Sequence, residues 1–330
     1  MIASSRWHWS KVVANAVTDT TTLGHLLALD EVALTERVVK NAFSLRVPLP
    51  FVARMQAGRL DDPLLCQILP DKKERQQTVN CSVDPLNERH YNAVPGVVHK
   101  YRGRVLLTAA VSCPINCRYC FRRHFPYNDN RLTPTSWQPA LDYIRSDTSI
   151  KEVILSGGEP LLLNDKVLFR LFDHIEAIDH VGIIRIHSRF PIAVPQRLTR
   201  TLNERLSGSR CKVTLVLHSN HPNEINDHVI NHLQPLVASP VTLLNQSVLL
   251  NGVNDNIDTL VELSNTLFNA GVLPYYLHAT DPVVGAAHFQ VPDSKARALA
   301  KAMTEALPGY LVPTLVREIG GEQAKTRLPL

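Results

Sequence analysis

The chain has 330 residues, is 45% hydrophobic and carries a formal net charge of +5. This is an ordinary globular composition, and the basic residues form no long run, so it indicates a solvated surface and no nucleic-acid partner. No stretch approaches the roughly 18 apolar residues of a membrane span, and the first residues lack the apolar core of a signal peptide, so we expect a cytoplasmic protein without a membrane segment.

Residues 1–95 are predicted to form a small helical N-terminal region. Helical periodicity runs through Thr22–Asn41 and Pro50–Ala57. The polar stretch over residues 71–96 has the composition of a loop. This region therefore leads into a second, larger unit.

From residue 104 onward, apolar β-branched runs alternate with amphipathic segments. The runs predict six strands: Arg104–Ala110, Glu152–Ser156, Gly182–His187, Lys212–His218, Thr242–Leu250 and Leu273–Ala279. The amphipathic segments predict helices: Trp137–Arg145, Val167–Ile178, Gln196–Leu206, Glu224–Leu236, Asp258–Asn269 and Ser294–Glu305. Continuous apolar strands separated by single helices imply a parallel sheet covered on both faces. We predict an α/β fold, a partial (β/α)6 barrel over residues 96–292, whose chemistry follows the C-terminal ends of the strands.

Three of the six cysteines lie directly after the first predicted strand, as Cys113, Cys117 and Cys120 in C-x3-C-x2-C spacing. A structural zinc site uses four closed ligands, and ferredoxin-type clusters use a fourth cysteine that is missing nearby. Three thiolates could hold a 4Fe–4S cluster with one iron open to a non-protein ligand. A zinc site completed by a distant histidine stays open as the alternative. The isolated Cys66, Cys81 and Cys211 make no disulfide framework.

The residues around this loop resemble the radical S-adenosylmethionine (SAM) superfamily, in which the open iron binds the methionine part of SAM. A second feature of that superfamily follows the second strand as LSGGEP. The resemblance implies SAM contacts from Ser156, Gly157, Gly158 and Glu159, where glycine lets backbone approach a neighbour closely. Ser188, Arg189 and His218 resemble further SAM-contacting positions, with partnered polar residues at a barrel mouth as the alternative.

A series of segments in order resembles the lysine 2,3-aminomutase family, from about Val94 to Thr326. They include VPGVVHKYRGRVLL, CRYCFRRHF, IIRIHSR, HSNHPNEI, NQSVLLNGVND and GYLVPTLV. The resemblance implies that a radical made from SAM abstracts hydrogen from the β-carbon of lysine. Pyridoxal 5′-phosphate (PLP) then assists migration of the amino group from C2 to C3.

The same resemblance implies a C-terminal PLP-binding segment over residues 293–330. Lys325 matches the lysine that bonds to PLP, and Arg104 and Tyr101 match positions around the PLP phosphate. Arginine suits a phosphate because its planar fork makes paired hydrogen bonds. The family's longer glycine run is reduced here to Gly320 and Gly321. A mobile polar tail is the alternative for Lys325.

Three further residues match substrate-binding positions of the family. Arg122 matches the arginine for the substrate carboxylate, and Asp281 and Glu318 match the acidic pair for the ε-ammonium of lysine. Desolvating an ammonium costs several kcal/mol, while one carboxylate at 4 Å recovers about 4 kcal/mol, so a pair is a sensible requirement. Glu318 stands where the family commonly has Asp, and it could instead pair with Arg317 or another cation.

The chain lacks the C-terminal cysteine cluster of some longer relatives. It resembles the compact bacterial branch that supplies (R)-β-lysine for modification of translation elongation factor P, where a separate ligase attaches the β-lysine. We therefore expect an isomerase acting on L-lysine, and we leave its homo-oligomeric state open. The alternatives are a free-lysine mutase of β-lysine metabolism, a radical SAM enzyme without PLP, and a non-catalytic binding module stabilised by zinc or a cluster.

Overall fold

A computed structural model describes residues 7–39, 43–76, 81–127, 129–130 and 132–329. Its centre is one sheet of parallel strands, in which each strand pairs with the next along the chain. The parallel strands are β3 (Arg104–Ala110), β4 (Glu152–Gly157), β5 (Ile183–Ser188), β6 (Lys212–Leu217), β7 (Thr242–Leu249), β8 (Leu273–Ala279) and β9 (Thr314–Arg317). All six predicted strands are present, and β9 adds a seventh that periodicity did not predict.

Antiparallel strands extend the sheet at both edges. They are β1 (Asn92–Val94) and β2 (Val97–Tyr101) before β3, and β10 (Thr326–Arg327) after β9. The parallel register places Thr108 of β3 beside Ser156 of β4, and Ser188 of β5 beside Leu217 of β6. The C-terminal ends of these strands therefore meet at one edge, as expected for a barrel.

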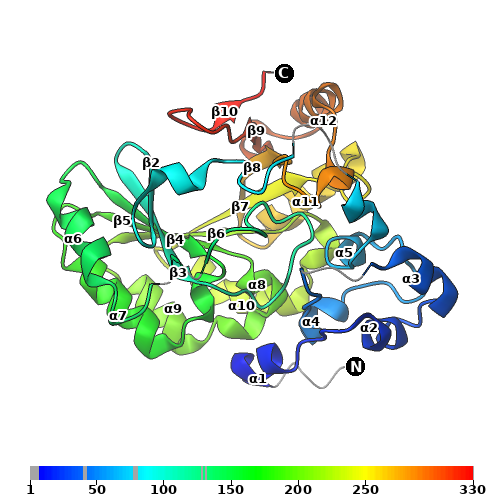
Figure 1. The fold of residues 1–330 in the computed structure, drawn as a ribbon, viewed down its shortest axis with the longest axis horizontal. Coiled ribbons are helices and arrows are strands. Elements are labelled where there is room, and N and C mark those ends of the chain that lie inside the picture. The colour runs from blue at the N-terminus through cyan, green and yellow to red at the C-terminus, as the bar shows by residue number, and fades with distance from the viewer. Residues whose placement is uncertain (1–6, 40–42, 77–80, 128, 131, 330) are drawn as a thin grey trace.

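The predicted helices lie between or after the strands and cover the outside of the sheet (Figure 1). They are α6 (Gln138–Ser146), α7 (Asp165–Glu176), α9 (Arg200–Ser207), α10 (Asp227–Val237), α11 (Ile257–Asn269) and α12 (Asp293–Ala306). Most begin at a capping side chain; Asn164 and Asn256, for example, accept hydrogen bonds from Val167 N and Thr259 N. Shorter helical turns are α8 (Phe190–Ala193), η4 (Pro160–Leu162), η5 (Pro195–Arg197), η6 (Pro222–Glu224), η7 (Ala287–Phe289) and η8 (Gly309–Leu311).

The N-terminal region packs beside the barrel as a group of short helices (Figure 1). They are α1 (Trp9–Ala14), α2 (Thr20–Leu26), α3 (Glu31–Arg37), α4 (Leu49–Val52), α5 (Pro63–Cys66), η2 (Lys72–Arg75) and η3 (Glu88–Tyr91). The helical periodicity predicted over Thr22–Asn41 corresponds to two helices, α2 and α3. Ala28 adopts a left-handed φ of 48°, and Asp30 caps a new helix by accepting from Ala33 N. Lys40 and Asn41 lie outside the described residues.

Buried apolar side chains of the N-terminal region and of most of the barrel form one continuous cluster, and two smaller clusters lie in the C-terminal part of the barrel. Trp9 of α1, for instance, lies edge-on to Phe190 after β5, with ring centroids 5.8 Å apart. The described part of the chain contains no helix that is both long and apolar enough to cross a membrane. The division into three domains at residues 95 and 292 stays a prediction.

Candidate active site

The cysteine loop follows β3 and is fastened to the N-terminal region through its backbone. Asn116 N donates to the carbonyl of Arg46 at 2.9 Å, and Arg118 N donates to the carbonyl of Gln67 at 2.8 Å. These bonds flank Cys117 on both sides. The N-terminal region therefore positions the loop that carries the thiols.

A buried carboxylate reinforces this attachment. Glu74 of η2 accepts hydrogen bonds from the guanidinium groups of Arg118 and Arg123, with closest distances of 2.5 and 2.7 Å. The three side chains are 3%, 0% and 4% exposed. Because a buried ion pair is stable only with good geometry and further hydrogen bonds, this triad holds the loop in one conformation.

The three predicted cluster ligands lie near one another and are free thiols. Burial, then the charges of Cys120 and Cys117, raises the pKa of Cys113. Burial, followed by Cys117, likewise raises the pKa of Cys120 to about 11. A group of half-buried thiols whose pKa values are raised is a donor set that a bound cation stabilises, because metal binding deprotonates the sulfur.

The chemistry of the donor set bears on the kind of metal site. Cys113, Cys117 and Cys120 offer three thiols from one loop. Thiolates are the usual ligands of iron–sulfur clusters, whereas a closed structural zinc site takes four ligands. Three thiols therefore fit a cluster that leaves one iron open, and the zinc alternative would need a fourth ligand from elsewhere in the chain.

The two glycines after β4 lie against the base of the cysteine loop. Gly157 has a left-handed φ of +106°, and a Cβ on Gly158 would lie 2.5 Å from the carbonyl oxygen of Ser112. Gly158 N donates to the carbonyl of Ala110 at 2.8 Å. The close approach that requires glycine is thus to the protein's own backbone, and the SAM contacts of this motif stay a prediction.

Glu159 is buried and its carboxylate binds the end of β5. It accepts from Ser188 Oγ at 2.7 Å, from Arg189 N at 3.0 Å and from Phe190 N at 3.2 Å. Burial raises the pKa of Glu159 to about 7 despite these hydrogen bonds. Glu159 and Ser188, both predicted to contact SAM, therefore join the second and third parallel strands of the barrel.

The guanidinium of Arg189 lies against one of the cluster thiols. Its Nη1 donates to Cys117 Sγ at 2.8 Å and also contacts the hydroxyl of Tyr119. Its Nη2 donates to Gln67 Oε1 at 2.8 Å and to Glu224 Oε2 at 3.1 Å. Gln67 and Glu224 therefore hold the guanidinium of Arg189 through Nη2, the nitrogen that does not contact the sulfur.

Three imidazoles line the interior of the barrel, at His187 of β5, His218 after β6 and His278 of β8. Burial, followed by the charges of Arg189 and Arg122, lowers the pKa of His218 to about 3. Burial also lowers the pKa values of His187 and His278. His218 Nε2 hydrogen-bonds to Gln246 Nε2 at 2.7 Å, whereas the buried Nε2 atoms of the other two have no partner in the described structure. All three rings are therefore neutral.

Lys325 lies inside the site and not in a free tail, because β10 pairs with β9 and returns it to the barrel. Its Nζ donates to Glu318 Oε2 at 2.5 Å. Glu318 Oε1 accepts from Lys100 Nζ at 3.0 Å and from Tyr101 Oη at 2.9 Å. Burial alone would raise the pKa of Glu318, but Lys325 and Lys100 outweigh it and hold the pKa well below its usual range.

Glu318 does not pair with its neighbour Arg317, which binds Asp293 at 2.6 Å instead. The second predicted acidic residue, Asp281, follows β8 and lies within electrostatic reach of Glu318 and Lys325. Its buried Oδ1 has no hydrogen-bond partner among the described residues. Burial, then the charge of Glu318, raises the pKa of Asp281 to about 7.

Arg104 and Tyr101 lie at the N-terminal start of β3, at the opposite end of the strand from the cysteine loop. The prediction that the chemistry follows the C-terminal ends of the strands therefore does not hold for these two residues. The guanidinium of Arg104 lies 4.8 Å from the ring centre of Tyr101. Arg185 of β5 binds Glu152 at 2.6 Å, and its buried Nε is unpartnered in the described structure. The charges of Arg104 and Arg185 both act on Tyr275, so these two guanidinium groups lie near one another, and guanidinium groups suit a phosphate.

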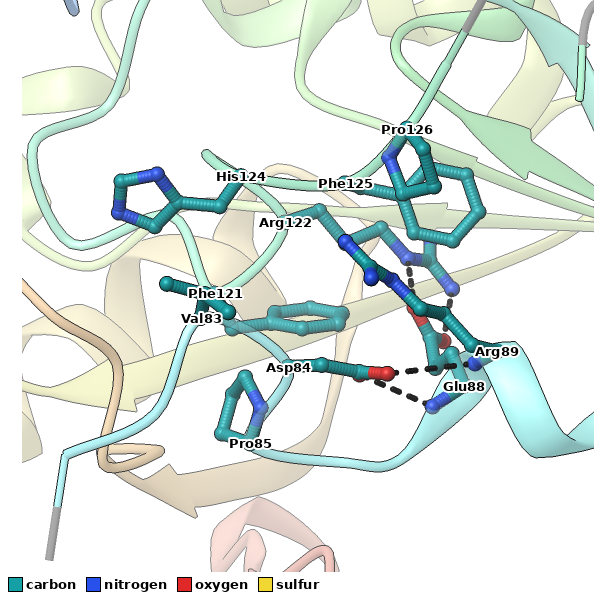
Figure 2. Close-up of a pocket in the computed structure, with 10 residues that line it drawn as sticks. All are labelled: Val83, Asp84, Pro85, Glu88, Arg89, Phe121, Arg122, His124, Phe125 and Pro126. Atoms are coloured by element: carbon teal, nitrogen blue, oxygen red, sulfur yellow. Dashed lines mark hydrogen bonds and ion pairs between the residues drawn. The ribbon is translucent and has the colours of Figure 1, made fainter. Parts of the chain in front are cut away.

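Arg122 is held by a carboxylate of the protein. Its Nε and Nη2 donate to Glu88 at 2.8 and 2.6 Å, and its Nη1 donates to Ser156 Oγ at 3.1 Å. Figure 2 shows this pair at the wall of a small pocket between residues 83–89 and 121–126. A substrate carboxylate must therefore share Arg122 with Glu88 or displace it.

Sequence reasoning missed several residues of the site: Gln67, Glu74, Glu88, Lys100, Arg185, His187, Gln246 and His278. Most act as partners of a predicted residue that is distant in sequence; Lys100 and Glu318, for example, are 218 positions apart. No local motif marks such a pair. The alternation within β5 and β8 could have indicated His187 and His278 as polar residues in otherwise apolar strands.

The Radical SAM superfamily model matches residues 108–209, which include the cysteine loop and β4 to α9. L-lysine 2,3-aminomutase of Escherichia coli (strain K12) is 48% identical over 99% of this chain and 96% of its own length. That of Haemophilus influenzae is 46% identical over 97% and 95%. The chain belongs to the L-lysine 2,3-aminomutase family. The family's Clostridium subterminale member is 36% identical over 88% of this chain and 70% of its own length.

Membership of the L-lysine 2,3-aminomutase family confirms the predicted family and the predicted enzyme class, an isomerase. The parallel sheet with its outer helices confirms the predicted radical SAM fold class. A solved radical SAM methyltransferase from Sphaerobacter thermophilus has a TM-score of 0.45 and 16% identity over 67% of this chain and 68% of that chain.

Proposed function

We propose that this chain is a PLP-dependent radical SAM aminomutase that converts L-lysine to β-lysine in the cytoplasm. One observation carries most of the proposal: Lys325, near the C-terminal end of the described chain, lies inside the barrel on Glu318, 2.5 Å away. Family membership and the cysteine loop support the radical chemistry. The placement of Lys325 supports PLP as a second cofactor.

The cysteine loop would hold the cluster through Cys113, Cys117 and Cys120. The cluster and SAM, when bound, supply the 5′-deoxyadenosyl radical, and PLP stabilises the substrate radical by delocalisation. The chain's own contribution is to fix the loop through Glu74 and to keep a cation, Arg189, on Cys117.

The PLP end would be formed by Lys325 together with the phosphate-binding cations. Arg104 of the β2–β3 hairpin and Arg185 of β5 would supply donors for a phosphate, and Tyr101 would lie beside it with its ring against Arg104. The neutral rings of His187 and His278 add unpartnered nitrogens to the barrel interior. These atoms gain hydrogen bonds when a polar group occupies the barrel, which favours binding there.

The substrate end would be formed by Arg122 for the carboxylate and by the acidic pair Asp281 and Glu318 for the ε-ammonium. Both acids are largely buried, so they discriminate strongly between an ammonium and an apolar chain end. A glutamate-specific site would need cationic or neutral groups at these positions. The acidic pair therefore supports lysine as the substrate.

For the physiological role, we propose that the product is (R)-β-lysine and that it serves modification of elongation factor P by a separate ligase. A supply of free β-lysine for metabolism is the competing role. Loss of the gene should leave elongation factor P without β-lysine. Unchanged modification in such a strain would favour the metabolic role.

The catalytic proposal is tested by anaerobic incubation of reconstituted protein with L-lysine, SAM, PLP and dithionite. β-Lysine should form, and Cys120→Ala should abolish it because the cluster loses a ligand. Borohydride reduction of the PLP-loaded protein should attach PLP covalently to Lys325. Labelling elsewhere, or product from the Cys120→Ala variant, would overturn the mechanism.

A further inference from the structure

The guanidinium group of Arg122 is held by the protein on several sides. Its Nε and Nη2 donate to the two carboxylate oxygens of Glu88 at 2.8 and 2.6 Å, as a bidentate pair along one edge of the group. Its Nη1 donates to Ser156 Oγ at 3.1 Å. The rings of Phe121 and Phe125 lie beside it, with their centres 4.9 and 5.9 Å from the guanidinium carbon (Figure 2). The orientation of Arg122 is therefore set by neighbouring side chains.

Glu88 is itself anchored, through the backbone at the start of η3. The carboxylate of Asp84 accepts hydrogen bonds from Glu88 N at 2.9 Å and from Arg89 N at 3.3 Å (Figure 2). The side chains of Arg122 and Glu88 are only 10% and 6% exposed. Removing one member of a buried ion pair leaves an uncompensated charge, so movement of Glu88 away from Arg122 is strongly disfavoured. The geometry thus favours a Glu88 that stays in place when a substrate binds.

Arg122 keeps hydrogen-bond donors that Glu88 does not use. A guanidinium has five N–H groups, two of them on each terminal nitrogen. In the described structure Nη1 and Nη2 each make one hydrogen bond, so each keeps a second N–H. Because the group is planar, the second N–H of Nη2 points away from the edge that Glu88 occupies, towards the end between Nη1 and Nη2. A substrate carboxylate can bind at that end without displacing Glu88.

The electrostatics are consistent with two carboxylates on one arginine. Burial acts to lower the pKa of Arg122, but the charge of Glu88 outweighs burial and holds the pKa above its usual range. Arg122 therefore stays cationic although it is buried. A substrate carboxylate at the far end of the guanidinium lies nearer to this cation than to Glu88. Because Coulomb energy falls with distance, attraction to Arg122 outweighs repulsion from Glu88.

We propose that Glu88 is a positioning residue for the substrate carboxylate: it remains on the Nε–Nη2 edge of Arg122 and directs the Nη1–Nη2 end towards the substrate. This inference rests on the proposed function and deepens it. Asp84 acts one step further away, because it fixes the backbone that carries Glu88. The segment over residues 84–88 thus contributes to selecting a free α-carboxylate, although none of its side chains touches the substrate.

The test compares L-lysine with L-lysinamide, which has both amino groups but an uncharged amide in place of the carboxylate. PLP-loaded protein without SAM or reductant is titrated with each compound, and the change in PLP absorbance gives each Kd. Glu88→Gln should raise the Kd for lysine by about tenfold, equivalent to about 1.4 kcal/mol, and leave that for lysinamide unchanged. Glu88→Asp, which keeps the charge, should retain most of the preference for lysine. Glu322→Gln is the matched control, because Glu322 is exposed in the loop between β9 and β10, and it should change neither Kd.

If Glu88→Gln cannot be prepared in folded form, Asp84→Ala loosens Glu88 without removing it and should weaken the binding of lysine alone, by a smaller factor. Tighter binding of lysine by Glu88→Gln would show that Glu88 blocks Arg122 and would overturn the proposal. An equal loss for lysine and lysinamide would also overturn it, since Glu88 would then support only the fold. A wild-type protein that binds both compounds equally would instead overturn the proposed role of Arg122 in carboxylate binding, and the role of Glu88 with it.

Discussion

At the scale of single residues, the barrel interior contains polar atoms that the described chain leaves unpartnered. They include Nε2 of His187 and His278, Nε of Arg185 and Oδ1 of Asp281. An unsatisfied buried donor or acceptor costs about 1–3 kcal/mol, so a group of such atoms favours a polar ligand or ordered water at that place. Periodicity could not predict that these atoms are buried and unpartnered, because the burial of each atom and its hydrogen-bond partners depend on strands that are distant in sequence.

The carboxyl group of Asp281 predicts a pH dependence of binding. Its pKa is raised to about 7 by burial and by Glu318, so the free protein holds it neutral below that pH. A neutral carboxyl binds an ammonium weakly. The preference for L-lysine over L-norleucine, which has the same carbon chain without the ε-amino group, should therefore fall as the pH decreases through about 7. Titrations of both amino acids between about pH 6 and pH 8 measure this, and Asp281→Asn should show a preference independent of pH.

The same shift has a consequence for stability. The folded protein binds the proton of Asp281 more tightly than the unfolded chain does, because the pKa rises from 3.8 to about 7 on folding. The contribution of this group to the free energy of unfolding therefore falls as the pH rises from about 4 to about 7. Asp281→Asn should remove that part of the decline in urea unfolding. An unchanged decline would show that Asp281 titrates normally.

Arg189 is predicted to set the reduction potential of the cluster. Its Nη1 lies 2.8 Å from Cys117 Sγ, and a cation with a hydrogen bond to a ligand sulfur stabilises the reduced cluster. Arg189→Gln should lower the ratio of reduced to oxidised cluster at a fixed potential by about tenfold, equivalent to about 59 mV. Redox titration followed by electron paramagnetic resonance measures the shift.

Glu224 supplies the matched variant for this prediction. Its Oε2 accepts a hydrogen bond from Arg189 Nη2 at 3.1 Å, and its side chain is fully buried. Glu224→Gln removes a negative charge and leaves the cation of Arg189 in place, so it should shift the potential upward. Two shifts of the same sign would contradict an electrostatic role for Arg189.

At the scale of secondary structure, periodicity predicted six of the seven parallel strands in the described structure and none of the antiparallel ones. Strands β3 and β8 have the predicted bounds, because each is an apolar run that is long enough to span the sheet. Strands β1, β9 and β10 have only three, four and two residues, which is too short for a pattern to be recognised. The pairing of β10 with β9 decides where Lys325 lies, so its place could be predicted only through the family resemblance.

The cysteine loop is attached to η2 through Glu74, so its position should depend on this one carboxylate. Glu74→Gln would leave Arg118 and Arg123 as buried cations without their common partner. Breaking a buried pair by removing one member costs about 3–5 kcal/mol, so we expect a loss of stability in this range from urea unfolding. Iron content after reconstitution should fall as well, because the loop carries the cluster ligands.

The exposed pair of Arg59 and Asp61 supplies the control for this measurement. The two side chains are 53% and 72% exposed, although their ion pair, at 2.7 Å, is as short as that between Arg123 and Glu74. Water screens an exposed ion pair, so Asp61→Asn should have little effect on unfolding or on iron content. Equal losses in the two variants would mean that Glu74 has no special role in holding the loop.

At the scale of the whole molecule, side chains connect the two edges of the open sheet. Lys100 and Tyr101 of β2 both bind Glu318, which follows β9. Ser82 bridges to Val283 in the loop after β8 and so joins the N-terminal segment to the same end of the barrel. These contacts join residues about 200 positions apart, which explains why the sequence indicated the elements but not the assembled site.

The continuous core predicts that the N-terminal region and the barrel unfold together. Trp9 lies 5.8 Å from Phe190, and Arg197 of the barrel lies 4.8 Å from the Trp9 ring, whereas Trp137 begins the barrel's helix α6. Variants that keep only Trp9 or only Trp137 should therefore give the same urea midpoint by fluorescence, as expected for one cooperative unit. Phe190→Ala should lower both midpoints together, because the cavity costs about 3–5 kcal/mol in a shared core. An earlier transition at Trp9 alone would identify residues 1–95 as an independent domain.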